Sequence, residues 1–149
     1  TYTYKARVGW VRTIHGSATL YGTWQLGRKA QYVLGLAQTT TTLPIMTTTG
    51  AGTLTALATG GFVPTTASFI TVIGYIVASG TAGASILFAP NASYPTNGTS
   101  GFMASTPINV NAQVAAHLVT MMLESTNIYH IEANIAALNI LCAGWEDNI

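Results

Sequence analysis

Charged side chains are scarce in this sequence. Asp, Glu, Lys and Arg make up 6% of its 149 residues, against about 25% in ordinary soluble domains, and none of them lies between Ala30 and Leu123. Disorder combines low hydrophobicity with high net charge, whereas here 49% of the residues are hydrophobic and the formal net charge is +1. We therefore expect the chain to fold, and its length predicts a single domain over residues 1–149.

Long apolar runs are also missing. A helix that crosses a membrane needs about 18 to 20 nearly continuous apolar residues. The best candidate, Phe69 to Ala78, is much shorter and ends at Ser79 and Gly80, which fits a buried strand better. We therefore expect no membrane span.

Groups that could perform chemistry are few. Cys142 is the one cysteine, so an internal disulfide is excluded, and its apolar neighbours predict a buried structural thiol. All carboxylates lie from Glu124 onward, and a Ser-His-Asp arrangement would have to use Asp147, the one aspartate. We expect no catalytic residues and no enzymatic activity.

The sequence also gives little support for a metal site or a cofactor site. His130 and Glu132 lie two residues apart, so on a strand they would share one face and could bind a metal with a third ligand. The sequence has no second cysteine, no HExxH motif and no acidic calcium loop, and Gly80 and Gly83 have no lysine beside them to form a phosphate loop. We interpret His130 and Glu132 as an exposed polar face and expect no metal and no cofactor.

The charges that are present are segregated along the chain. All five basic residues lie within the first 29 positions and all four acidic ones near the C-terminal end, too few for a nucleic-acid-binding domain, although Lys5 and Arg7 would share a strand face. If the first and last strands were neighbours, Lys5 or Arg7 would lie beside Glu132 or Glu146. We interpret these four residues as interaction sites that fix strand register, within one subunit or between subunits.

Short alternating segments, separated by Thr and Gly, predict an all-β fold. Residues 1–14, 17–24 and 31–38 predict a meander with a turn at 27–29, and Pro44 marks a loop or an edge strand. Residues 53–59 alternate weakly.

The middle and the end of the chain predict longer strands. Residues 69–78 are apolar on both faces, which predicts a central strand, and with the return strand at 85–89 they predict a hairpin. Residues 110–123 fit a strand or one short helix, and we favour the strand. A long, kinked strand is expected over 127–145, with Ile131 and Ile135 on its inner face.

The fold class that follows is an antiparallel β-sandwich, jelly-roll-like in style. Its inner face should combine the apolar positions of the alternating segments. The expected core residues are Val8, Trp10, Leu20, Phe69, Val72, Ile76, Ile86, Ile131 and Ile135.

The uncharged, Thr/Ala/Gly-rich strand pattern, with "ITVIGYIVASGTAGASILF" and the late "IYHIEANI", resembles small jelly-roll-like virion structural proteins: capsid, head-fibre and decoration proteins of phages and other viruses. The resemblance implies a homo-oligomer in the virion that packs on other shell proteins. A subunit packed against copies of itself buries its uncharged faces and needs less surface charge.

Two other classes stay open. A carbohydrate- or surface-binding β-sandwich module would use Trp10, Trp24 and Trp145 as stacking platforms, and an extracellular filament subunit would donate its N-terminal strand to the next subunit. A monomer in solution would indicate the first, an open polymer the second, and a closed oligomer the virion protein.

Overall fold

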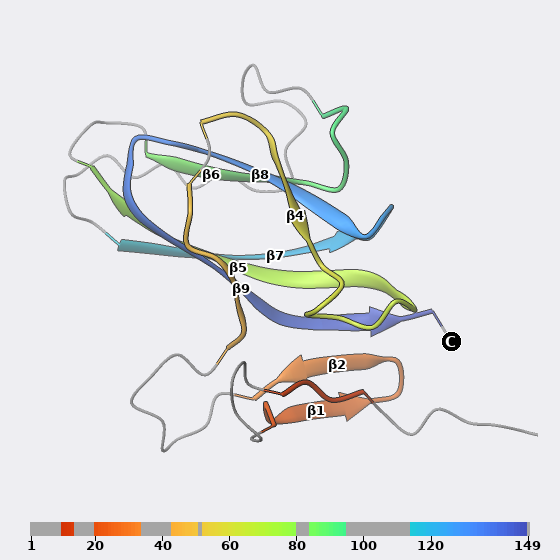
Figure 1. Cartoon of the computed structure of the whole chain (residues 1–149). Helices are drawn as coiled ribbons and strands as arrows, with labels where there is room; N and C mark the ends of the chain where they lie inside the picture. Colours follow the sequence, from red (N-terminus) through yellow and green to blue (C-terminus); the bar gives the residue numbers. More distant parts are fainter. Residues whose placement is uncertain are drawn as a thin grey trace, which may run out of the picture.

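The computed structural model of the chain describes residues 10–13, 20–33, 43–50, 52–79, 84–94 and 114–148. Its strands form two antiparallel sheets (Figure 1). The larger sheet contains β1 (Thr23–Leu26), β2 (Lys29–Tyr32), β3 (Ile45–Thr47), β5 (Ala67–Ala78), β7 (Val114–Met122) and β9 (Ile135–Asp147). The smaller sheet contains β4 (Thr55–Ala58), β6 (Ser85–Ala89) and β8 (Asn127–Ala133). The described residues form no helix, and the predicted antiparallel β-sandwich is confirmed.

The six-stranded sheet has the order β1-β2-β9-β5-β7, with β3 also pairing with β9, and the three-stranded sheet has the order β4-β8-β6. In Figure 1 the small sheet lies above β5, β7 and β9, and the β1–β2 hairpin lies below them. β5 is flanked by β9 and β7, so the predicted central strand is confirmed. β3 begins directly after Pro44. Proline has no N–H to donate, and just before the strand this does not interrupt the hydrogen bonds between strands.

The predicted hairpin between residues 69–78 and 85–89 is wrong. β5 and β6 lie in different sheets, and β6 pairs with β8. The two strands meet face to face instead: a Cβ at Gly74 of β5 would lie 2.9 Å from Ile86 Cδ1 and 3.0 Å from a ring carbon of Phe88. A segment that is apolar on both faces can use one face to pack on the opposite sheet, which local turn chemistry does not reveal.

The ambiguous segment 110–123 is a strand from Val114 to Met122, and residues 110–113 lie outside the described part. β7 pairs with β5 over nine consecutive positions, from Phe69↔Met122 to Val77↔Val114. This long ladder, with Val119 and Met121 pointing into the core, explains why the strand forms rather than the helix.

The predicted long C-terminal strand is divided in two. β8 belongs to the small sheet and β9 to the large one, and the chain changes sheet at Asn134, whose φ is 55°. Asn is one of the few residues with a side chain that accept this left-handed conformation. On β8 the buried residues are Ile128, His130 and Glu132, so the inner face is the one opposite to that predicted.

One cluster of buried side chains joins the two sheets. Of the expected core residues, Val72, Ile76 and Ile86 are fully buried, while Trp10 and Ile135 pack at its margin. Three expectations are wrong: Leu20 is exposed, and Phe69 and Ile131 are only half buried, because both occupy the faces of their strands that point away from the core. Val8 lies outside the described residues.

An aromatic cluster attaches the β1–β2 hairpin to the sandwich. Tyr32 packs edge-on against Trp145 at 5.5 Å and against Tyr21 at 5.6 Å, and Trp10 meets Trp145 at 5.1 Å. The predicted turn is present at Gly27 and Arg28, with Gly27 at φ 59°, whereas Lys29, the last residue of the predicted turn, already belongs to β2. Most of the first predicted strand lies outside the described residues.

Candidate functional site

The face of the six-stranded sheet that points away from the three-stranded sheet, called the outer face below, carries most of the exposed apolar side chains. Directly paired residues of an antiparallel sheet point to the same side, so the register defines rows of neighbours across it. Among the described residues, eight large apolar side chains are exposed. Six belong to the outer face: Trp24, Leu26, Ile45, Val114, Leu118 and Met122.

Three rows make up the middle of this face. The first is Leu26, Lys29, Glu146, Phe69 and Met122. The second is Trp24, Gln31, Gly144, Thr71 and Thr120. The third is Ile45, Leu141, Ile73 and Leu118. Charge is confined to the first row, and the other two present apolar, amide and hydroxyl groups.

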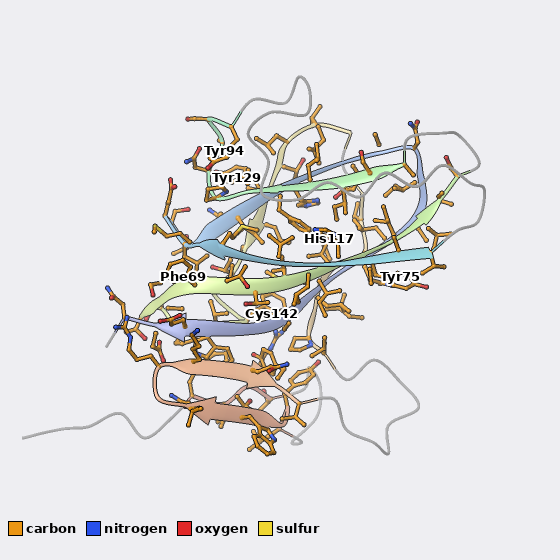
Figure 2. The ribbon with its side chains drawn as sticks, turned by 180° about the vertical axis from the view of Figure 1, so that it is seen from behind. Phe69, Tyr75, Tyr94, His117, Tyr129 and Cys142 are labelled. Atoms are coloured by element: carbon orange, nitrogen blue, oxygen red, sulfur yellow. The ribbon has the colours of Figure 1, made fainter. Side chains whose placement is uncertain are left out.

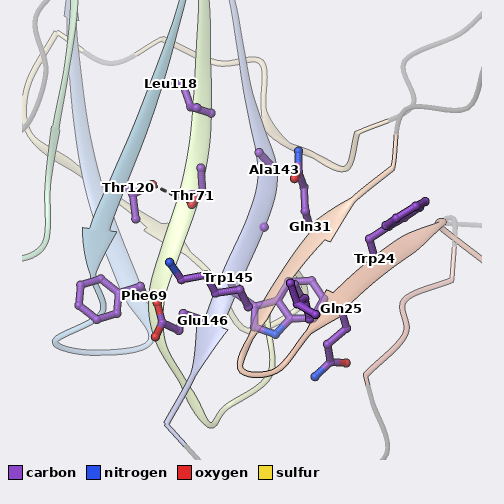
Figure 3. Close-up of a pocket in the computed structure, with 14 residues that line it drawn as sticks. Trp24, Gln25, Gln31, Phe69, Thr71, Leu118, Thr120, Ala143, Trp145 and Glu146 are labelled. Carbon is purple, nitrogen blue, oxygen red and sulfur yellow. Dashed lines mark hydrogen bonds between the residues drawn. The ribbon is translucent and has the colours of Figure 1, made fainter.

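A groove with a volume of about 700 Å³ runs across these rows (Figure 3). Its middle is low because Ala143 and Gly144 of β9 have small or no side chains. One wall comes from β1 and β2, with Trp24 76% exposed, and the other from β5 and β7, with Leu118 63% exposed. On the second wall the hydroxyls of Thr71 and Thr120 are 2.9 Å apart and hydrogen-bonded.

The two charges of the groove are neighbours. Lys29 of β2 lies directly opposite Glu146 of β9, and beside them Arg28 Nε donates a hydrogen bond to the carbonyl oxygen of Asp147 at 2.7 Å. Basic residues from early in the chain thus lie beside the acidic C-terminal strand. Lys5 and Arg7 lie outside the described residues, so their pairing with Glu132 or Glu146 stays a prediction.

The outer face therefore offers a surface for contact, and its groove offers a site for a ligand. No family model, curated protein or solved structure matches the chain. What the protein does has to be inferred from the geometry of this face.

The interpretation of His130 and Glu132 as an exposed polar face is wrong. Both side chains are buried in the three-stranded sheet, and His130 Nδ1 lies 2.5 Å from Glu132 Oε1. Polar groups can be buried when they hydrogen-bond to each other, and positions two apart on one strand allow this. Glu132 also borders a second, smaller pocket of about 360 Å³ beside Gly50 and Asn134.

The described residues contain no group of three or more His, Cys, Asp or Glu side chains that could hold a metal ion. They also contain no helix of the length and apolar character needed to cross a bilayer.

Cys142 of β9, labelled in Figure 2, is buried, as the sequence predicted. Loss of hydration raises the pKa of its thiol to about 12, even though the backbone of Gly144 and the nearby Arg12 act in the opposite direction. The thiol is therefore protonated, and a protonated thiol is a poor nucleophile. Burial raises the pKa of the neighbouring Tyr32 as well.

This shift predicts a loss of stability in alkali. Below pH 9 the folded and unfolded states both hold the Cys142 proton; between pH 9 and about 12 the unfolded state releases it while the folded state keeps it. The free energy of unfolding should therefore fall by about 1.4 kcal/mol per pH unit from this group. Urea unfolding at pH 8 to 11 should show a shallower decline in Cys142→Ala, and an unchanged slope would contradict the assignment.

Sequence reasoning missed the groove. Trp24, Gln31, Thr71 and Thr120 are far apart in the chain and form one row only through the pairing of five strands. A weak signal existed in residues 69–78, whose apolar character on both faces leaves one face for contacts outside the core.

Proposed function

We propose that the chain is a non-enzymatic structural protein of a virion, a capsid, decoration or head-fibre subunit that self-associates and packs on a shell. The observation that carries the proposal is the outer face, where six large apolar side chains are exposed on one sheet. Apolar surface gathered in this way marks an interaction site.

The connection of the strands supports the proposal. From β3 onward the chain passes from one sheet to the other at each described strand, which gives β3-β9-β5-β7 opposite β4-β8-β6. A jelly-roll-like sandwich orders its strands in this manner, and viral capsid domains are among the proteins that use that architecture. Lectins and cupins use the jelly roll too. The connectivity therefore supports the fold class, and the support for a structural role in a virion comes from the exposed surface.

Edge strand β7 is the part of the surface most suited to self-association. Within the described part of the chain it pairs with β5 alone, and its nine residues contain no charge and no proline. Proteins that remain monomeric usually protect such an edge with charged residues or proline. An unprotected apolar edge can pair with the same edge of a second copy, and Val114 and Ala116 lie on its exposed outer side.

Charge placed on this edge should break the assembly. We expect Val114→Asp and Ala116→Asp to fold as the wild type does, since both positions are exposed, and to shift the protein toward monomer, because burying an unpaired carboxylate costs several kcal/mol. Light scattering coupled to size exclusion measures the shift, and circular dichroism checks the fold.

Thr65→Asp is the matched control, since Thr65 is exposed in the turn before β5 and off the outer face. It should assemble like the wild type. If the two β7 variants assemble as well as Thr65→Asp does, β7 is not the interface.

A further inference from the structure

Trp24 is the most unusual surface residue of the groove. Its indole is 76% exposed on the groove wall formed by β1, where Figure 3 shows it across the groove from Thr71 and Thr120. By contrast, Trp145 is buried and Trp10 packs against it. An indole left in water has a large apolar face available for a partner that stacks on it.

Neutral hydrogen-bonding groups stand beside this indole. Gln31 is the cross-strand neighbour of Trp24 and is exposed in the groove. On the opposite wall Thr71 and Thr120 share one hydrogen bond, in which either hydroxyl can be the donor. Each hydroxyl keeps acceptor capacity, and the pair keeps one proton to donate outward.

The charge of the groove is balanced. Lys29 and Glu146 are its two charged lining residues, and they lie directly opposite each other on β2 and β9. An anionic ligand such as nucleic acid needs an excess of cations, which this groove lacks. A purely apolar ligand would bury the Gln31 amide, and the one proton that the Thr71–Thr120 pair does not use, without partners, at a cost of about 1–3 kcal/mol per group.

We propose that this groove binds a neutral oligosaccharide. A sugar ring has an apolar face of C–H groups that can stack on Trp24, and hydroxyls at its rim that can bond to Gln31, Thr71 and Thr120. The volume of about 700 Å³ lies within the range of about 300–1,000 Å³ typical of ligand sites. This function goes beyond self-association and is tested separately from it, because Val114 and Ala116, whose variants test assembly, do not line the groove.

The test titrates the full chain with maltohexaose, cellohexaose and chitohexaose, and with hyaluronan hexasaccharide as a charged comparison. We expect at least one neutral probe to bind with a dissociation constant below about 1 mM by calorimetry and to change the tryptophan emission. That change should disappear in Trp24→Phe, which retains Trp10 and Trp145.

Affinity for the bound probe should fall at least about tenfold in Trp24→Ala, which corresponds to about 1.4 kcal/mol, and should also fall in Gln31→Ala. Thr65→Ala, at an exposed position away from both the groove and β7, is the matched control and should bind like the wild type. The proposal is overturned if no neutral probe binds, if hyaluronan binds better than all of them, or if Trp24→Ala binds unchanged. The β7 variants test assembly separately, at positions that do not line the groove.

Discussion

Gly144→Ala is expected to lower the free energy of unfolding by about 2–3 kcal/mol, a large effect for one methyl group. A Cβ at this position would lie 2.4 Å from the carbonyl oxygen of Ala30 and 3.1 Å from the Cα of Gln31. Both are backbone atoms of β2, so no side-chain rotation can relieve the clash, and β2 has to move away from β9. Urea unfolding at neutral pH measures the loss.

Gly52→Ala is the control for this substitution, since a Cβ at Gly52 meets nothing within 4 Å. We expect its stability to stay within about 0.5 kcal/mol of the wild type. Because Gly144 lies between Gln31 and Thr71 on the floor of the groove, Gly144→Ala should also disturb the groove. Equal stability of the two alanine variants would show that β2 and β9 are not as closely packed as described.

Glu132→Ala is expected to cost about 3–5 kcal/mol, because it leaves the buried His130 without the carboxylate 2.5 Å from its Nδ1. Removal of both partners should cost less than the sum of the single losses. A double-mutant cycle with His130→Ala should give a coupling energy of about 0.5–3 kcal/mol.

Glu146→Ala is the matched comparison. Glu146 is a half-exposed carboxylate of the outer face, and its neighbour Lys29 lies directly opposite it on the adjacent strand β2. An exposed pair of this kind contributes about 0–1 kcal/mol. Two results would contradict a stabilising contact between His130 and Glu132. One is an equal loss of unfolding free energy in Glu132→Ala and Glu146→Ala. The other is a double variant whose loss equals the sum of the losses in His130→Ala and Glu132→Ala.

Local sequence patterns were sufficient for several parts of the fold. The apolar run at 69–78 predicted the central strand, and Gly27 with its polar neighbours predicted the turn between β1 and β2. These features depend on residues that are close in sequence, where alternation and turn chemistry act directly.

The faces and partners of the strands could not be predicted in the same way. His130 and Glu132 appeared exposed because each is polar by itself, whereas together they can be buried. The partner of Ser85–Ala89 is β8, about forty residues later in the chain, and no turn signal identifies it. The groove depends on both kinds of information, because five strands have to be in register before Trp24 and Thr120 share a row.

The mass of the unmodified chain in solution shows whether it self-associates, as we propose, through the outer face and β7. Light scattering at micromolar concentration should give a closed oligomer whose mass is a fixed multiple of the 15.6 kDa chain. Electron microscopy of the same sample should show discrete particles of one size. A monodisperse monomer of 15.6 kDa would rule out self-association. An open polymer would rule out the closed oligomer and would indicate a filament subunit instead.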